Sequence, residues 1–175
     1  KVTVQQRILN ASGMAVVSAR SSAVSIAPGE NTDIIQDLMM SSPNLWTIET
    51  PDLYTMETTV KIGGRAVDVY KTSFGVRSAR FDKDQGFLLN GERVKLKGVC
   101  LHTNSGSLGV AIPDRSFERC LEILKEYGVN AIRFGHHQPQ SVFLDMCDRM
   151  GFVVYEEVFD KWKAGSGYYS EFFDE

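Results

Sequence analysis

The sequence lacks the features that mark several specialised classes of protein. Its 175 residues include three cysteines, an odd number without CxxC spacing, so neither a disulfide framework nor a cysteine zinc site is indicated. No run approaches the roughly 18 to 20 apolar residues that a membrane helix needs. The net charge is -3, with basic residues scattered along the chain, so neither nucleic acid nor a membrane is expected as a partner.

The first ten residues, KVTVQQRILN, do not have the layout of a signal peptide and resemble the middle of a β-strand. We therefore expect the chain to begin inside a domain. Apolar residues make up 43% of the chain, enough for a packed core. Cys120 and Cys147 fall on apolar helix faces, which predicts buried free thiols.

Residues 1–78 have the short alternating pattern of a β-protein. Strands are expected at residues 2–9, 14–26, 53–62 and 65–76. Gly63-Gly64 predicts a tight hairpin turn, because glycine reaches positive φ without steric cost. About five strands are visible, fewer than the seven or more of an immunoglobulin-like sandwich. We predict an antiparallel, immunoglobulin-like β-sandwich domain that is incomplete at its N-terminus.

Residues 79–175 change to alternating strand and helix patterns. A turn at Asn90-Gly91 leads to an expected strand at 94–97. Further strands are expected at 98–101, 130–134 and 152–155, with helices at 115–127 and 141–150 between them. Asp114 is the expected N-cap of the first helix, and Gly128 and Gly151 are the expected stops of the two helices.

Successive β-α units predict parallel strands, in either a doubly wound sheet or the first part of a (β/α)8 TIM barrel. Neither GxGxxG nor GxxxxGK[ST] follows a strand, so the dinucleotide and P-loop alternatives lose support. We therefore predict the start of a barrel, with about three of its eight strands.

Polar residues follow each of these three strands: His102 after the first, Arg133 and His136 around the end of the second, and Glu156 and Glu157 after the third. Barrel enzymes carry their chemistry at this face. An ion pair of Arg133 with Glu156 or Glu157 explains the arginine as well as a ligand role does. His102 is equally well explained as a structural histidine.

Three other functions for these residues have little support: a metal site, a cysteine nucleophile and a catalytic pair of adjacent glutamates. His102, His136 and Glu157 could surround a metal, but HxH and HExxH spacings are missing, and no metal or cofactor is expected. Cys100 lacks the surroundings of a nucleophile elbow. His136 and its neighbour His137 should point to opposite sides of an extended chain. Two adjacent glutamates cannot flank a glycosidic bond at the roughly 5 to 5.5 Å that a retaining pair needs.

Four ordered segments resemble glycoside hydrolase family 2. They are SPNLWTIETPDLY at 42–54, FGVR at 74–77, FLLNG through KGV at 87–99, and NAIR through His136 followed by CDRMG at 130–151. The resemblance implies that the first domain is the family's immunoglobulin-like domain and the second its TIM-barrel domain. The family contains retaining β-galactosidases, β-glucuronidases and β-mannosidases. The continuation VFDKW at 158–162, which contains Asp160, is most similar to a β-galactosidase subgroup.

The resemblance implies roles for four residues. His102 and His136 correspond to histidines that hydrogen-bond sugar hydroxyls, Arg133 to the arginine that supports them, and Glu157 to an acidic residue at the end of the third strand. The sequence departs from the family at Gly135, where serine is usual, and at His137-Gln138. These departures affect the loop that contacts the sugar.

The family's acid/base glutamate follows the fourth barrel strand and its nucleophile lies on the seventh, so both are expected beyond Glu175. The resemblance then implies a parent enzyme that hydrolyses terminal β-D-galactosides, with a carbohydrate substrate and no catalytic residue in this chain. We expect the chain alone to be inactive and to self-associate, or the parent to be a homo-oligomer. The compartment is open, with bacterial cytoplasm or periplasm as the expectation.

A non-catalytic module is the rival from another class, in which the sandwich binds carbohydrate or joins domains. Trp46 and Tyr54 could then form an exposed aromatic platform. Equally, both could be core residues at the junction of the domains, which the prolines at 43 and 51 around Trp46 favour.

Overall fold

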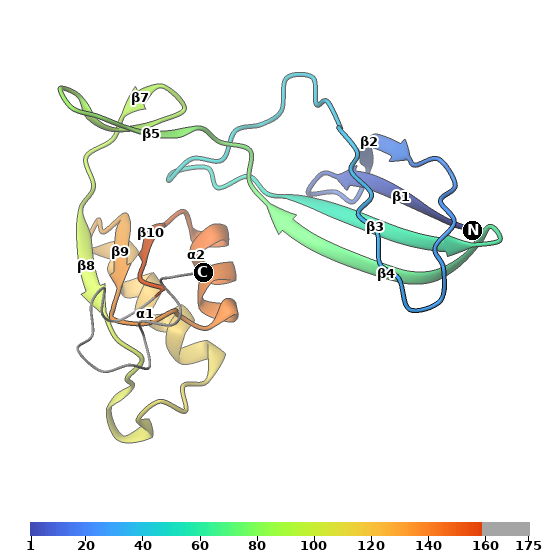
Figure 1. Cartoon of the computed structure of the whole chain (residues 1–175). Helices are drawn as coiled ribbons and strands as arrows, with labels where there is room; N and C mark the ends of the chain where they lie inside the picture. The colour runs from blue at the N-terminus through green and yellow to red at the C-terminus, as the bar shows by residue number, and fades with distance from the viewer. Residues whose placement is uncertain (159–175) are drawn as a thin grey trace, which may run out of the picture. The chain divides into compact units, whose positions relative to one another are not determined.

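The computed structural model describes residues 1–158, which fall into two compact units (Figure 1). Unit 1 contains Lys1–Arg80 together with Leu89–Glu92. Unit 2 contains Phe81–Leu88 and the described residues from Arg93 onward. No helix among the described residues is long and apolar enough to span a membrane.

Unit 1 is built on a four-stranded antiparallel sheet with the order β2-β1-β3-β4 (Figure 1). Its strands are β1 (Val2–Leu9), β2 (Ala15–Arg20), β3 (Tyr54–Ile62) and β4 (Arg65–Phe74). Gly63 and Gly64 join β3 to β4 with φ of +58° and +85°, values that suit glycine. The predicted hairpin is therefore confirmed.

Unit 1 contains one of the two sheets that the predicted sandwich would need. Every position of β4 except Phe74 is at the exposed level, so this strand buries no face of its own. The second predicted strand is also shorter than expected: β2 ends at Arg20, and Val24 makes an isolated bridge to Val2. A sheet buries a face only against another layer, and residues 1–80 supply one layer.

Trp46 is the most deeply buried large apolar side chain of unit 1. Its side chain is 1% exposed, and its backbone N–H donates to the carbonyl of Val76 at 2.8 Å. The guanidinium of Arg77 lies 4.5 Å from the centre of the indole ring, a cation–π contact. A Cβ on Gly75 would lie 2.7 Å from the Cβ of Trp46, so only glycine fits there. The core alternative for Trp46 is therefore confirmed and the exposed platform is wrong.

A short three-stranded sheet, with the order β5-β6-β7, follows in the chain. Its strands are β5 (Ala79–Asp82), β6 (Gly86–Leu89) and β7 (Glu92–Arg93). Asn90 and Gly91 turn between β6 and β7 with φ of 54° and 85°, which confirms the predicted turn.

The structure has no strand at residues 94–97, so this prediction is wrong, and the side chain of Asn130 binds part of the segment. The amide of Asn130 donates to the carbonyl of Lys95 at 3.0 Å. Its oxygen accepts from the backbone N–H of Lys97 at 2.7 Å. Both backbone groups are thus satisfied without a sheet partner.

Unit 2 contains a parallel three-stranded sheet with the order β10-β9-β8. Its strands are β8 (Gly98–Leu101), β9 (Ala131–Phe134) and β10 (Val153–Glu156). A short 3-10 helix, η1 (Gly106–Leu108), and helix α1 (Asp114–Glu126) connect β8 to β9, and α2 (Ser141–Met150) connects β9 to β10. This arrangement confirms the predicted parallel β-α units.

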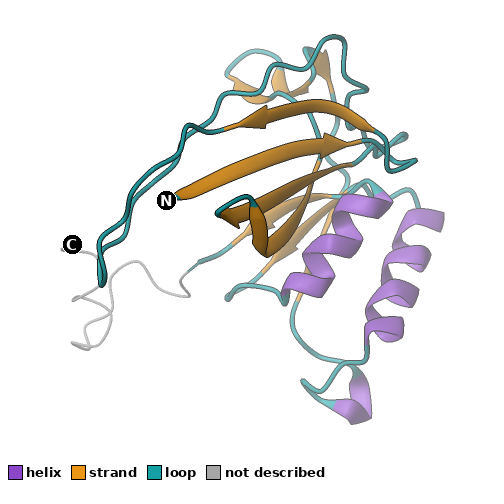
Figure 2. Ribbon diagram, turned by 90° about the vertical axis from the view of Figure 1, so that its right-hand side faces the viewer, coloured by secondary structure: helices purple, strands orange, loops and turns teal. Residues whose placement is uncertain are grey.

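The two helices of unit 2 run side by side (Figure 2). Phe117, Leu121 and Phe143 are buried from the helices and pack with Ile132 and Phe134 of β9. These residues recur at the 3.6-residue period of a helix and the two-residue period of a strand, so each element presents one apolar face to the same core.

The predicted N-cap at Asp114 is wrong. Pro113 occupies the cap with φ of -64°, and Asp114 is the first helical residue, where its carboxylate complements the positive end of the helix dipole. Gly151 ends α2 in the left-handed conformation, with φ of 72°, as predicted. The ammonium of Lys125 donates to the carbonyl of Gly151 at 2.8 Å and thereby ties α1 to the end of α2.

Candidate functional site

Arg133 lies on the face of the parallel sheet that is turned away from the helices, and the other expected site residues follow the carboxyl ends of the strands. Ile132 and Phe134 of β9 are buried against α1 and α2. Arg133 lies between them in sequence, so alternation directs it to the opposite face. In the sheet register, Arg133 is flanked by Cys100 of β8 and Tyr155 of β10.

Glu157 joins two of the expected residues at the carboxyl end of the sheet. Its Oε1 accepts a hydrogen bond from Nη2 of Arg133. Its Oε2 lies 2.9 Å from Nδ1 of His136. The arginine therefore pairs with Glu157 and not with Glu156, which decides between the two partners that the sequence left open. We call Arg133, His136 and Glu157 the carboxylate triad.

His102 lies beside this triad. Its ring centre is 5.9 Å from that of His136, and the two ring planes are inclined by 55°. The residues that follow β8, β9 and β10 thus meet, as expected for parallel strands whose carboxyl ends lie at one edge. The structure brings together all four residues to which the resemblance assigned roles.

The charges in the triad are matched. Burial opposes ionisation of Glu157, but hydrogen bonds from His136 and Arg133 and the charge of the guanidinium outweigh it and lower the pKa of the carboxyl. The thiol of Cys100, 3.8 Å from Nη1 of Arg133, and the Glu157 carboxylate raise the pKa of the guanidinium. Arg133 and Glu157 therefore persist as an ion pair at neutral pH. The side chain of Glu157 is 16% exposed, and that of Arg133 is 39% exposed.

Gly135 leaves room for this ion pair. A Cβ at this position would lie 3.2 Å from Oε2 of Glu157 and 3.4 Å from Cζ of Arg133. Both contacts are tight, so a side chain there would press on the groups that form the triad. The departure from serine noted in the sequence thus falls next to the site.

His137 has partners different from those of His136, as predicted for adjacent residues. Its Nε2 lies 3.3 Å from the hydroxyl of Thr103, and its ring meets that of Phe134 edge-on, with 5.2 Å between centres. His137 therefore links the loop after β9 to the loop after β8.

Cys100 is the neighbour that sequence reasoning missed. From the sequence, Cys100 was a candidate only for a nucleophile. In the structure, Nη1 of Arg133 donates to its thiol sulfur. Two-residue alternation from His102 places Cys100 on the same face of the strand, so the signal was available in the spacing.

The described part of the chain contains no group of three or more His, Cys, Asp or Glu side chains arranged to hold a metal ion. The site residue Glu157 lies within it, whereas Asp160 and most of the 158–162 continuation lie outside the described residues.

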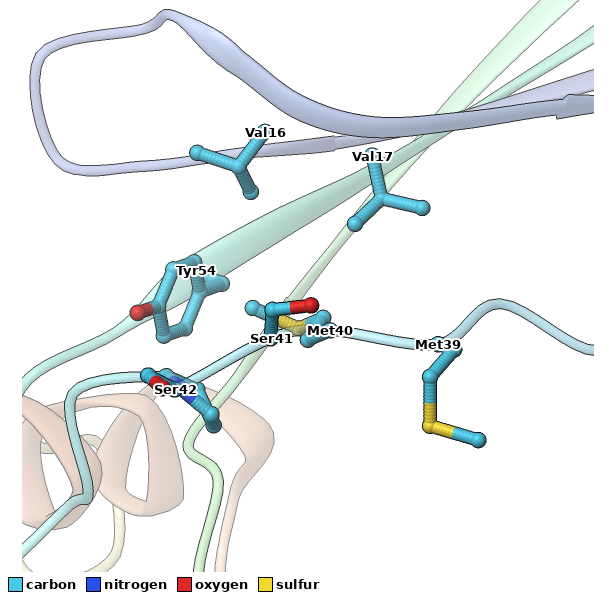
Figure 3. A pocket seen from close by; sticks show the side chains of 8 residues that line it. Val16, Val17, Met39, Met40, Ser41, Ser42 and Tyr54 are labelled. Atoms are coloured by element: carbon cyan, nitrogen blue, oxygen red, sulfur yellow. The ribbon is translucent and has the colours of Figure 1, made fainter.

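A hollow of about 220 Å³ lies elsewhere, in unit 1 (Figure 3). It is lined by Val16, Val17, Met39, Met40, Ser41, Ser42, Pro43 and Tyr54. The lining carries neither a carboxylate nor an imidazole, and the Tyr54 hydroxyl accepts from the backbone N–H of Asn44 at 2.9 Å. This hollow therefore offers neither a carboxylate nor an imidazole, the commonest groups for acid-base chemistry.

Comparison with known proteins identifies the family. The family model described as "Glycosyl hydrolases family 2" matches residues 1–77, and the one described as "Glycosyl hydrolases family 2, TIM barrel domain" matches residues 82–161. The chain belongs to glycoside hydrolase family 2. The first model covers most of unit 1, and the second covers most of unit 2.

Curated relatives carry two different names. The chain is 43% identical over 176 residues to "Beta-galactosidase BoGH2A" of Bacteroides ovatus, covering 99% of this chain and 21% of that protein. It is 31% identical over 159 residues to "Beta-glucuronidase" of Bacteroides fragilis, covering 89% of this chain and 23% of that protein. The chain thus spans about a fifth of the length of these relatives.

Solved structures agree with this assignment. A glycosyl hydrolase family 2 member from Bacteroides cellulosilyticus superposes with a TM-score of 0.89 at 35% identity, covering 99% of this chain and 23% of the other. A β-glucuronidase from glycoside hydrolase family 2 gives a TM-score of 0.89 at 28% identity, covering 97% of this chain and 18% of the other.

Proposed function

We propose that the protein to which this chain belongs is a retaining exo-β-glycosidase, and that His102, His136 and Arg133 bind its terminal sugar, with Glu157 in support. In a retaining mechanism one carboxylic acid protonates the leaving oxygen, and a second carboxylate forms a glycosyl-enzyme that water later cleaves. Hydrogen bonds to sugar hydroxyls that strengthen in the transition state lower the barrier to both steps. This chain supplies residues for those hydrogen bonds.

The observation that carries the proposal is that Arg133 and His136 engage both carboxylate oxygens of Glu157. A general acid needs a raised pKa, and the pKa of Glu157 is lowered. A nucleophile needs a carboxylate oxygen directed at the sugar, whereas Oε1 and Oε2 of Glu157 are engaged by Arg133 and His136. Glu157 therefore orients its neighbours, and the acid and nucleophile come from other residues of the protein.

A terminal β-D-galactoside is the substrate that we propose. The positive charge of Arg133 is neutralised by Glu157, so this part of the site suits a neutral sugar better than the carboxylate of a glucuronide. The relative of 43% identity is named a β-galactosidase, while others are named β-glucuronidases. β-Glucuronidase and β-mannosidase remain the alternatives within the family.

The test compares nitrophenyl β-galactoside, β-glucuronide and β-mannoside as substrates of the protein that contains this chain. We expect the highest kcat/KM with the galactoside, and a higher value with either other substrate would overturn the sugar assignment. We expect no turnover from the 175-residue chain, because both carboxylate oxygens of Glu157 are engaged by Arg133 and His136 and are not free to act as acid or nucleophile. Turnover by the pure chain would contradict this.

The non-catalytic alternative loses its main support. Trp46 is 1% exposed and Tyr54 is 7% exposed, so neither offers a flat surface on which a sugar ring could stack. Sugar titrations followed by tryptophan fluorescence in a Trp162→Phe variant, which isolates Trp46, should show no change. A saturable change would favour a carbohydrate-binding module.

A further inference from the structure

The imidazole of His136 makes its polar contacts at one nitrogen. Nδ1 lies 2.9 Å from Oε2 of Glu157 and 3.4 Å from Nη2 of Arg133. Within residues 1–158, both hydrogen-bond contacts of the ring are at Nδ1, and the side chain is 58% exposed. The charged and titratable groups that face the ring are Arg133 from β9, Glu157 after β10 and His102 after β8.

The two contacts at Nδ1 demand opposite roles of this atom. Toward Glu157 it must donate, since an ionised carboxylate only accepts. Toward Arg133 it must accept, since a guanidinium only donates. The position of one proton therefore decides which contact is a hydrogen bond.

Distance and charge favour donation to Glu157. At 2.9 Å the contact has the length of a charge-assisted hydrogen bond, and a lone pair on Nδ1 would instead face the lone pairs of the carboxylate. The 3.4 Å contact is beyond the usual range, and Nη2 of Arg133 already donates to Oε1 of the same carboxylate. The lowered pKa of Glu157 keeps it an acceptor at neutral pH.

We infer that Glu157 holds neutral His136 as its Nδ1–H tautomer, so that Nε2 offers a lone pair to the hydroxyl of a bound sugar. Glu157 is then a positioning residue that acts through His136. The hydrogen bond at one ring nitrogen determines the role of the other. The part that concerns the sugar rests on the proposed function, whereas the tautomer does not.

The tautomer of His136 determines which groups of a sugar its Nε2 can bind. A lone pair on Nε2 recognises a hydroxyl hydrogen and gives nothing to an ether oxygen or a fluorine. Sugars in which the contacted hydroxyl is replaced by fluorine keep an acceptor but lose the donor, so they should lose this contact. A site with N–H at Nε2 would instead tolerate such replacements.

The test is nitrogen-15 NMR of the histidine rings in the 175-residue chain, which contains three histidines. Measured at a pH where the rings are neutral, wild-type His136 should show a protonated Nδ1 and an unprotonated Nε2. Glu157→Ala should move the proton to Nε2, the form that a free imidazole prefers. Glu157→Gln, which retains an acceptor oxygen without charge, should restore part of the Nδ1–H form.

His137 supplies the internal control. Its Nδ1 lies 2.9 Å from the carbonyl of Gln138, which can only accept, so this ring is also Nδ1–H. Its signals should be the same in wild type and in both variants, which shows that the fold is retained. A wild-type His136 with the proton on Nε2 would overturn the inference whatever the variants show.

Failure of the proposed function has a different signature. Adding galactose should shift the Nε2 resonance of His136 in wild type, and 4-, 3- and 2-deoxyfluoro galactosides should identify the hydroxyl concerned by loss of that shift. If the tautomer is as inferred but no sugar moves the resonance, the role of His136 in sugar binding is wrong and the positioning by Glu157 stands.

Discussion

Gly75 is the position where adding one methyl group should have the largest effect on unit 1. In Gly75→Ala the new Cβ would lie 2.7 Å from Cβ of Trp46 and 2.9 Å from both Cγ and Cδ1. Carbon atoms in contact prefer about 3.5 to 4.0 Å, so these atoms must separate by roughly 0.7 Å or more. Trp46 cannot move outward easily, because its side chain is 1% exposed and the guanidinium of Arg77 lies over its ring. Its backbone N–H is also hydrogen-bonded to the carbonyl of Val76.

The expected loss of stability follows from two opposing effects. Overpacking a core costs about 1 to 3 kcal/mol, and the immobile indole puts this site near the upper end. Replacing glycine stabilises by roughly 0.4 to 1 kcal/mol through the unfolded chain. The net destabilisation of unit 1 is then about 2 kcal/mol, the difference between these values.

Urea unfolding followed by the fluorescence of Trp46 in the Trp162→Phe background measures this loss. With an m-value of about 1 to 2 kcal/mol/M, the midpoint should fall by about 1 to 2 M. Gly98→Ala in unit 2 is the comparison for an alanine in ordinary contact, because its Cβ would meet Ala131 at 3.5 to 3.8 Å, and its midpoint is read from circular dichroism because Trp46 reports on unit 1. The reasoning is refuted if Gly75→Ala and Gly98→Ala shift the midpoint equally.

Three further predictions concern the reactivity of the cysteines, self-association through strand β4 and the pH dependence due to Glu157. In the folded chain at pH 8, iodoacetamide should label Cys100, which is exposed, long before Cys147, whose pKa burial raises to about 12; equal rates by mass spectrometry would contradict the buried position of Cys147. The wild-type chain should increase in mass with concentration in light scattering, and Val69→Lys on the exposed edge strand β4 should reduce this; a strictly monomeric wild type argues against it. Pairing lowers the pKa of Glu157 below its ordinary 4.5, so native Glu157 binds fewer protons than the unfolded chain. The resulting stability is present above that value and is lost as the pH falls through the folded pKa, so Glu157→Gln should lower the Tm at pH 7 and not at strongly acid pH. An unchanged difference across this range would show that the ion pair is not its cause.

The elements were predictable where the local pattern is regular. Phe117, Leu121 and Phe143 recur at helical spacing, and the glycines at 63–64 and 151 suit conformations that other residues avoid. The predictions failed where the backbone found a partner far away in the sequence. Residues 94–97 form no strand, and Asn130, more than thirty positions away, binds Lys95 and Lys97, a contact that no local pattern could reveal.

The candidate site was predictable in its location but not in its pairing. Parallel strands bring their carboxyl ends to one edge, so His102, His136 and Glu157 were expected to approach one another. The sheet register pairs Glu156 with Phe134, whose side chain is buried against the helices. Alternation then directs Glu157 to the opposite face, which is the face of Arg133. The sequence alone could not provide this pairing, because it does not give the register.

The sequence by itself determined the family, the order of strands and helices, and the separation of His136 from His137, because each depends on local periods or contiguous motifs. The tertiary structure decided that Trp46 is buried against Gly75, that Glu157 and not Glu156 binds Arg133, and that Cys100 lies beside that arginine. Each of these contacts joins residues more than twenty positions apart. Such contacts arise only when the chain folds, because strand register and packing, not spacing along the chain, determine which side chains meet.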